Sequence, residues 1–247
     1  MRHGGIKFVR QLKMRLIHLI DILGTLAFAV SGAFRAVKYE LDLLGVMVLA
    51  VATGVGGGIM RDLLLGSTPP TPLVDQTYIL TCLLGAALVF LMAPKIAQRW
   101  DYVMAADAVG LSVFTAIGAA KAEECGAVPL TVVMMAMITA SGGGMIRDLL
   151  VMEVPAVLKS DFYATAALIG GTCFVMLGRL GVGDGTRLAC TIAVTLSLRA
   201  LAMKYGMRLP RVKSLPVSPS RLTQQRKGGA PKPDDKDLSN KPDASDA

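Results

Sequence analysis

The chain has few of the residues from which most catalytic and metal sites are built. Among 247 residues it contains two histidines, His3 and His18, both near the N-terminus. A Ser-His-Asp triad or a histidine-based metal site therefore has no residues from which to assemble. The four cysteines lie in or beside different apolar segments and show no C-x-x-C spacing. This pattern favours reduced thiols over a disulfide or metal framework.

Aromatic residues make up 5% of the chain and charged residues 18%, while the formal net charge is +8. The lysines and arginines gather at the two ends and in loops, without an interleaved basic and aromatic face. This distribution argues against nucleic acid as a partner and favours contact with a membrane surface.

Apolar residues dominate the composition, at 53% of the chain. Seven apolar stretches approach the roughly 20 residues that a membrane-spanning helix needs. We therefore predict an all-α membrane protein rather than a soluble helical core. The predicted spans are residues 16–36, 43–60, 73–93, 102–120, 128–147, 161–178 and 186–203.

Both ends of the chain differ from this apolar body. Residues 1–15 form a basic N-terminal extension that resembles the start of a signal peptide, with Ala27 to Ala29 as a possible cleavage site. We expect no cleavage, because that triplet lies within an internal repeat, and Met14 is an alternative start of translation. Residues 205–247 are rich in Pro, Ser, Lys and Asp, which predicts a disordered tail.

The chain repeats itself at a fixed offset of 86 residues. Over residues 21–69 there are 18 identities in 49 positions, which indicates an ancestral duplication. We assign residues 16–100 to the first three-span repeat, 101–182 to the second and 183–204 to a seventh span. Because each repeat has an odd number of spans, the second should enter the membrane from the opposite side.

Positive charges in short loops predict the orientation. Arg35 and Lys38 follow the first span, and Lys204 follows the seventh, on the same side as the basic residues after spans 3 and 5. This places the C-terminal tail in the cytoplasm and the N-terminus outside, although the basic N-terminal extension argues the other way.

A glycine triplet stands in the same place in each repeat. Gly56, Gly57 and Gly58 correspond to Gly142, Gly143 and Gly144. Glycine costs up to about 1 kcal/mol relative to alanine in a helix, so kinks or unwound points are expected. Paired interruptions in two inverted halves indicate a transport site near the midplane. The alternative is that the glycines only allow helices to pack closely.

An Arg-Asp pair follows each triplet. Arg61 with Asp62, and Arg147 with Asp148, lie in segments predicted to be inside the membrane. A lone charge there costs about 2.5 to 3.5 kcal/mol or more, so these groups should be paired or hydrated. Asp21 and Asp107, which begin spans 1 and 4, are candidate partners, within a half or across the two halves. A structural ion-pair network and a charged permeation path are both open interpretations.

The motifs GGGIMRD and GGGMIRD, at a fixed offset in a seven-span chain, resemble those of the prokaryotic trimeric intracellular cation (TRIC) channels. This group is also described as a glycine transporter domain and as the UPF0126 membrane family. The resemblance covers roughly residues 16–204. The lysine-containing motif with which animal members bind phosphoinositides has no clear equivalent here, so lipid regulation of that kind is not expected.

The resemblance implies a homotrimer in which each protomer has its own pore, kinked at the glycine triplets and surrounded by the charged residues. It implies conduction of monovalent cations, potassium and sodium, across the cell inner (plasma) membrane, with membrane lipids as neighbours. The triplet residues would be the pore and kink positions. The pore charge or gating positions would be Arg61, Asp62, Arg147, Asp148, Asp21 and Asp107.

A secondary transporter for glycine or another small amino acid is the alternative function, because inverted repeats with interrupted helices suit it equally well. An enzyme is not expected, and neither is a cofactor. No predicted strand precedes the triplets, and no Gly-Lys-Ser/Thr follows them, so they do not form a phosphate-binding loop.

Overall fold

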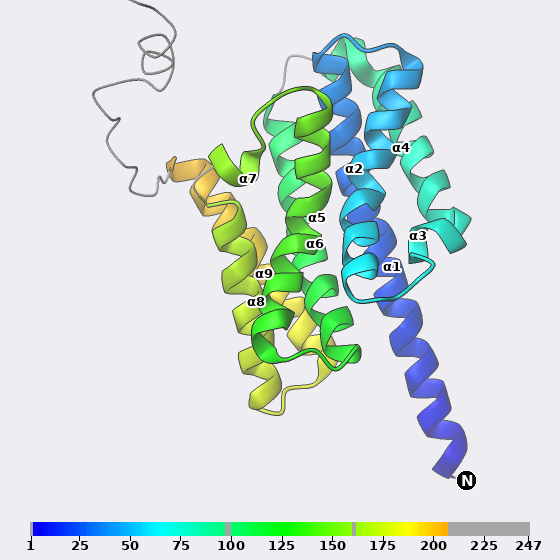
Figure 1. The fold of residues 1–247 in the computed structure, drawn as a ribbon, viewed down its shortest axis with the longest axis vertical. Coiled ribbons are helices and arrows are strands. Elements are labelled where there is room, and N and C mark those ends of the chain that lie inside the picture. The colour runs from blue at the N-terminus through cyan, green and yellow to red at the C-terminus, as the bar shows by residue number, and fades with distance from the viewer. Residues whose placement is uncertain (1, 97–99, 160–161, 207–247) are drawn as a thin grey trace, which may run out of the picture. The chain divides into compact units, whose positions relative to one another are not determined.

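Long helices account for most of the part of the chain that the computed structural model describes, which is residues 2–96, 100–159 and 162–206. Seven helices of at least 16 residues and two short ones are found within these ranges, and no strand (Figure 1). Their bounds are α1 Arg2–Lys38, α2 Leu43–Leu64, α3 Thr71–Val74, α4 Gln76–Ile96, α5 Trp100–Glu124, α6 Pro129–Leu150, α7 Ala156–Lys159, α8 Ala164–Arg179 and α9 Asp184–Tyr205.

Each predicted span falls on one of the long helices. Five segments are long and apolar enough to cross a membrane, and two further apolar helices, Gln76–Met92 and Ala164–Arg179, are shorter. The five segments are Ile17–Lys38, Leu43–Leu64, Val103–Glu124, Pro129–Leu150 and Asp184–Tyr205. The all-α membrane class is therefore confirmed, and five of the seven predicted spans meet the length and hydropathy that a crossing requires.

The basic N-terminal extension is helical from Arg2 onward, because α1 begins at that residue. Of the predicted tail, residues 205 and 206 end α9, and residues 207–247 lie outside the described residues.

Local sequence explains where the central helices begin and end. Asp42 caps α2, accepting a hydrogen bond from the backbone N–H of Gly45 at 2.7 Å. Pro129 occupies the first turn of α6, where its missing N–H costs nothing. Gly206 ends α9 in the left-handed conformation, with φ of 58°.

The helices pack in a pattern that the repeat duplicates. In the first repeat α1 packs on α2 and α4, and in the second α5 packs on α6 and α8. The two repeats meet where α1 packs on α5 and α2 packs on α6, which lie side by side in Figure 1. α9 packs on α5 and α8, so it belongs to the second repeat's side of the bundle.

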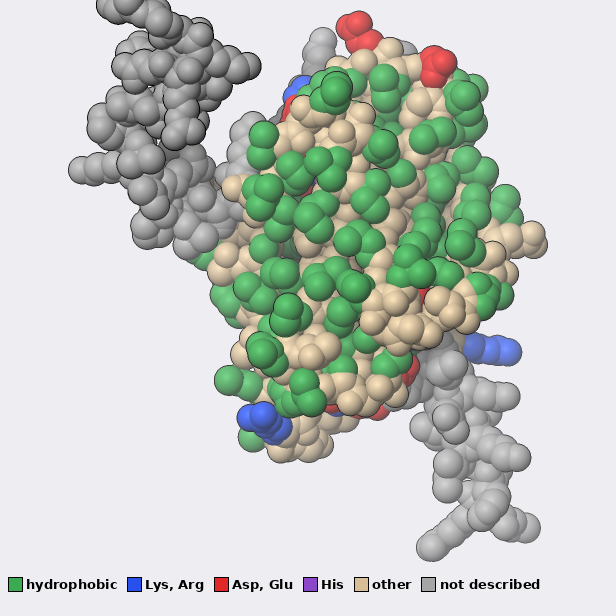
Figure 2. All heavy atoms as spheres, in the orientation of Figure 1, with side chains coloured by type: hydrophobic (Ala, Val, Ile, Leu, Met, Phe, Trp, Pro, Cys, Tyr) green, Lys and Arg blue, Asp and Glu red, His purple; other side chains and the backbone are tan. Residues whose placement is uncertain are grey.

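Small residues fill much of the contact between α1 and α2, and many large apolar residues face outward, although Phe28 and Phe114 pack together in the core. Buried positions on α1 and α2 include Ala29, Ala33 and Ala50, each fully inaccessible to solvent. By contrast, Leu84, Leu91 and Leu130 are 71–80% exposed. Figure 2 shows hydrophobic side chains spread over the visible face, with charged ones mainly at its two ends. Such a surface suits lipid as its solvent.

Candidate functional site: two buried charged clusters on either side of a glycine crossing

The two glycine triplets meet each other where α2 crosses α6. A Cβ on Gly57 would collide with the carbonyl oxygen of Thr139, and a Cβ on Gly143 would collide with the carbonyl oxygen of Thr53. A Cβ on Gly142 would lie 3.1 Å from the Cα of Gly57. The absence of side chains therefore lets the two backbones touch, as in other small-residue crossings in membranes.

Both helices are continuous through this crossing. All six triplet residues lie inside uninterrupted α-helix, so the prediction of unwound points is wrong, while a kink at either triplet stays a prediction. The physical reason is that close packing of α2 on α6 outweighs the weak helix propensity of glycine. The alternative that the sequence left open, close packing, describes the contact between the triplets in this structure.

Two threonines lie where α1 packs on α2 and where α5 packs on α6. A Cβ on Gly32 of α1 would lie 2.7 Å from the carbonyl oxygen of Leu49, and one on Gly118 of α5 would lie 2.8 Å from that of Met135. The hydroxyl groups of Thr53 and Thr139 donate to these same two oxygens, each at 2.6 Å. The four central helices are thus joined through backbone contacts that follow the repeat.

The first charged cluster, here called the Arg61 cluster, lies beyond the crossing toward the C-terminal end of α2. Nε of Arg61 donates to Oδ1 of Asp62 at 2.8 Å, and the N–H of Thr71 donates to Oδ2 of Asp62 at 2.8 Å. The hydroxyl of Tyr78 donates to Asp21 at 2.8 Å. Within the described residues, Nη1 of Arg61 is buried without a hydrogen-bond partner.

The second cluster, here called the Arg147 cluster, repeats this arrangement at the other end of the bundle. Nε of Arg147 donates to Oδ1 of Asp148 at 2.9 Å, and the N–H of Ala156 donates to Oδ2 of Asp148 at 2.8 Å. Here Nη1 also donates, to Oδ1 of Asp107 at 2.7 Å and to the hydroxyl of Ser31 at 2.5 Å. Arg147 is 3% exposed, so its charge is neutralised by direct contact with carboxylates.

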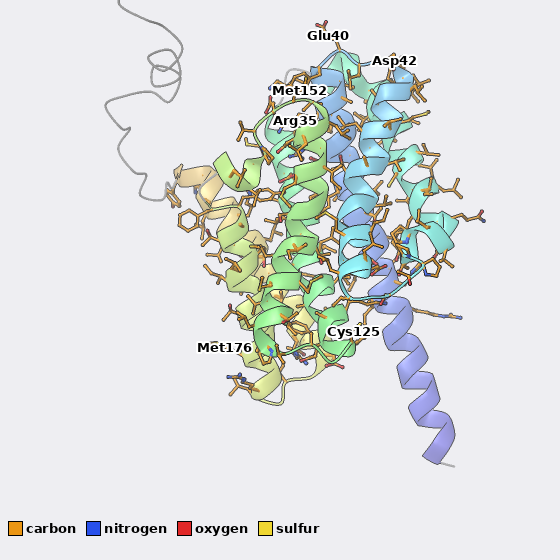
Figure 3. All side chains as sticks on the ribbon, viewed as in Figure 1. Arg35, Glu40, Asp42, Cys125, Met152 and Met176 are labelled. Atoms are coloured by element: carbon orange, nitrogen blue, oxygen red, sulfur yellow. The ribbon has the colours of Figure 1, made fainter. Side chains whose placement is uncertain are left out.

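Arg35 extends the Arg147 cluster to the surface. Its Nη2 lies 3.0 Å from Oδ1 of Asp148, and its Nη1 lies 3.2 Å from Oε2 of Glu153. The hydroxyl of Tyr39 donates to Glu153, and this hydrogen bond, with the charge of Arg35, lowers the pKa of Glu153. Figure 3 shows Arg35 with Met152 at one end of the bundle and Cys125 at the opposite end; we call these the Arg35 end and the Cys125 end.

The structure joins most of the charged residues that the sequence singled out. Asp107 is bonded to Arg147, within the same half, whereas Asp148 pairs both with Arg147 and with Arg35 of the first half. Asp21 lies in the Arg61 cluster, but the described residues show no hydrogen bond or ion pair between it and Arg61. Each arginine also contacts, through its Nε, the aspartate that follows it in sequence.

Sequence reasoning missed several residues of these clusters. Ser31 is a single hydroxyl residue in an apolar span, so the sequence did not mark it as part of a site. Arg35 was used only to predict the orientation in the membrane. Tyr78 and Tyr163, which donate to Asp21 and Asp107, play the same part in the two clusters, but they are 85 residues apart, one fewer than the repeat offset, so the ungapped repeat alignment does not pair them.

A cavity of about 170 Å³ lies at the Cys125 end, beside the Arg61 cluster. Asp21, Arg61 and Thr71 contribute to its lining, and Lys121 and Glu124 of α5 supply further charges. We call it the Arg61 cavity. It brings polar and charged groups of both repeats together at one end of the apolar bundle, where Asp21 and Arg61 are buried, and buried ionisable groups in a membrane protein mark transport pathways.

Comparison with known proteins identifies relatives over most of the chain. The family model described as Glycine transporter matches twice, at residues 18–94 and 104–179, once for each repeat. A UPF0126 membrane protein of Vibrio cholerae is 39% identical over 209 residues, covering 84% of this chain and 87% of the relative. The UPF0126 inner membrane protein YadS of Escherichia coli is 38% identical over 198 residues, covering 79% of this chain and 95% of the relative.

Solved structures match to the same extent. The TRIC trimeric intracellular cation channel orthologue from Rhodobacter sphaeroides is 38% identical, with a TM-score of 0.75, covering 78% of this chain and 99% of that one. A second TRIC cation channel is 40% identical at the same TM-score and covers 81% of this chain and 98% of that one. Since sequence relatives and solved structures agree across both repeats, the chain belongs to the prokaryotic TRIC channel family, whose members also carry the names UPF0126 and Glycine transporter.

Proposed function

We propose that the chain forms a membrane channel for monovalent cations, permeable to potassium and sodium. The observation that carries this proposal is an excess of carboxylates over arginines within the Arg61 and Arg147 clusters, on either side of the α2–α6 crossing of a lipid-facing bundle. Four aspartates oppose two arginines in the Arg61 and Arg147 clusters, while Arg35 and Glu153 add one charge of each sign. The four aspartates are Asp21, Asp62, Asp107 and Asp148.

Formal negative charge in a narrow membrane path attracts cations and repels anions. The buried carboxylates lie at both ends of the α2–α6 crossing, so a cation entering from either side would meet them in turn. We place the narrowest part of the path at the two glycine triplets. There, backbone contact would have to loosen for an ion to pass, which makes the crossing a natural gate.

The same proposal includes seven membrane spans in two inverted three-span repeats, with α9 as the seventh. Corresponding helices and clusters at opposite ends of the bundle support this topology. The Arg35 end would be cytoplasmic, because Arg35, Lys38 and Lys204 gather near it. The assembly would be a homotrimer with one pore in each protomer, embedded in the lipids of the cell inner membrane.

Transport of glycine or another small amino acid is the second candidate function. The Arg61 cavity favours it in one respect, since Arg61 and Lys121 could face a carboxylate while Asp21 and Glu124 face an ammonium group. Ion conduction and amino-acid transport therefore need an experiment that separates them.

Purified protein in a planar bilayer provides that test. With a potassium chloride gradient and no amino acid, we expect unitary currents that reverse near the potassium equilibrium potential. Absence of current, together with saturable glycine uptake into liposomes, would overturn the channel proposal in favour of the transporter.

Two variants make the measurement specific. Asp21→Asn removes a buried carboxylate, so potassium conductance should fall severalfold. Asp42→Asn removes an exposed carboxylate while preserving the helix cap, so it should conduct like the parent. Equal conductance in both variants would show that buried charge does not select the ion.

A further inference from the structure

The Arg147–Asp107 pair and the corresponding Arg61–Asp21 pair are arranged differently in the two repeats. At the Arg35 end, Arg147 and Asp107 are in direct contact, at 2.7 Å. At the Cys125 end, the corresponding Arg61 and Asp21 make no direct ion pair among the described residues, and Nη1 of Arg61 has no partner. One end therefore holds a closed pair and the other holds an open pair beside a cavity.

A substitution between the repeats accounts for the difference. Ser31 accepts a hydrogen bond from Nη1 of Arg147 at 2.5 Å, which holds the guanidinium against Asp107. At the 86-residue offset, the residue of the second repeat that corresponds to Ser31 is Ile117. Ile117 lines the Arg61 cavity and offers no acceptor, so nothing equivalent draws Arg61 into place.

A second substitution acts in the same direction. Arg35 bonds Asp148 and Glu153 with two separate nitrogens, which ties α1 to the end of α6. Its counterpart at the 86-residue offset is Lys121, which lines the Arg61 cavity. Lysine cannot make the forked contact that arginine makes, so the Cys125 end lacks the corresponding tie.

We propose that Ser31 and Ile117 are positioning residues that decide which end of the pathway is shut. Ser31 holds the Arg147–Asp107 pair closed and seals the Arg35 end, whereas Ile117 leaves the Arg61–Asp21 pair open and keeps the Arg61 cavity accessible from the Cys125 end. The proposal rests on the proposed function only in calling this interior a pathway. The asymmetry itself is a property of the fold and can be measured without any transport.

Matched cysteine probes can report on the two ends. Thr71 and Ala156 are equivalent reporters, because each is partly buried and each donates its backbone N–H to the aspartate of its cluster. Thr71→Cys and Ala156→Cys would be made separately in full-length protein in detergent. Modification by a membrane-impermeant trimethylammonium thiosulfonate would be followed by mass spectrometry of the labelled peptide, so the native cysteines do not interfere.

We expect the thiol introduced by Thr71→Cys to react faster than the one introduced by Ala156→Cys. Adding Ser31→Ala should raise the rate at position 156 roughly tenfold, because a buried hydrogen bond to a charged group is lost. Ser31→Thr, which keeps the hydroxyl, should restore the slow rate. An unchanged rate at position 156 in Ser31→Ala would overturn the role assigned to Ser31.

The reverse change tests the other end. Ile117→Ser adds the missing acceptor beside Arg61, so the rate at position 71 should fall roughly tenfold. Ile117→Ala opens the same space without a hydroxyl and should not slow the reaction. If both variants slow it equally, the packing of Ile117 rather than its lack of an acceptor sets the asymmetry, and the proposal fails.

These rates separate the two proposals. If the Ser31 and Ile117 variants change the cysteine modification rates as expected but the protein carries no potassium current, the asymmetry is supported and the channel is rejected. Potassium current together with rates that ignore both residues would support the channel and reject the asymmetry.

Discussion

Gly57 of α2 lies against the carbonyl oxygen of Thr139 of α6, with no room for a Cβ between them. The same contact recurs between Gly143 and Thr53, so each triplet receives the backbone of the other helix. Since a carbonyl oxygen in a continuous helix cannot move independently, a methyl group at either position must separate the two helices. The crossing therefore leaves no space for a side chain at Gly57 or Gly143.

Gly57→Ala should lower the stability of the protein and Gly58→Ala should not. A Cβ at Gly58 would meet its nearest neighbours, Pro72 and Arg61, at 3.6 and 3.8 Å, which is ordinary contact. Overpacking at Gly57 should cost about 1 to 3 kcal/mol, whereas alanine at Gly58 favours helix by up to about 1 kcal/mol. Thermal unfolding in detergent would compare them, and equal midpoints would contradict a backbone contact at Gly57.

Breaking the Arg147–Asp107 pair should cost more than replacing it. Asp107→Leu alone leaves the guanidinium with fewer acceptors in a buried site, which typically costs about 3 to 5 kcal/mol. Combining it with Arg147→Met removes the charge, and stability should largely recover. A double-mutant cycle on unfolding free energies measures this coupling. Additive effects of the two substitutions would show that the pair is not coupled.

Composition, span lengths and the 86-residue repeat were sufficient to predict the helices, because hydrophobic length and sequence identity are local properties. They also marked Arg147 and Asp107, since a charge in an apolar span requires a partner. The close meeting of Gly57 with Thr139 could not be predicted, because it depends on which faces of α2 and α6 meet. For the same reason Ser31 was missed: one hydroxyl in a span acquires a role only through a neighbour 116 residues away.

Arg187 fixes α9 to the rest of the bundle and should not tolerate lysine. Its guanidinium lies over the ring of Phe174 at 4.0 Å and donates to Glu123 at 2.7 Å and to Asp184 at 3.3 Å. Lysine keeps the charge but loses the fork and the stacking, so Arg187→Lys should cost about 2 kcal/mol. Arg179→Lys, at an exposed site, is the control and should unfold like the parent. A parental unfolding midpoint for Arg187→Lys would contradict this role.

The contact between Tyr39 and Glu153 should make stability depend on pH at the acid end. The hydrogen bond from Tyr39, followed by the charge of Arg35, lowers the pKa of Glu153 below its ordinary value of 4.5. A carboxylate with a lowered pKa in the folded state stabilises it above the unfolded pKa and loses that contribution as the pH falls through the folded pKa. This contribution to stability should therefore be constant from pH 7 to about 5 and decline below 4.5.

Tyr39→Phe removes the hydrogen bond and should return the pKa of Glu153 toward its unfolded value of 4.5, so the loss of stability that this group causes below about pH 5 should become smaller. Glu153→Gln removes the titrating group and should abolish this part of the pH dependence. Unfolding midpoints between pH 3 and 7 for the parent and both variants would measure the effect. Because the same contact raises the pKa of Tyr39 above 10.0, its hydroxyl stays protonated and able to donate throughout this range. If the unfolding midpoints of the parent and Tyr39→Phe fall equally with decreasing pH, the hydroxyl does not hold Glu153 in its charged form.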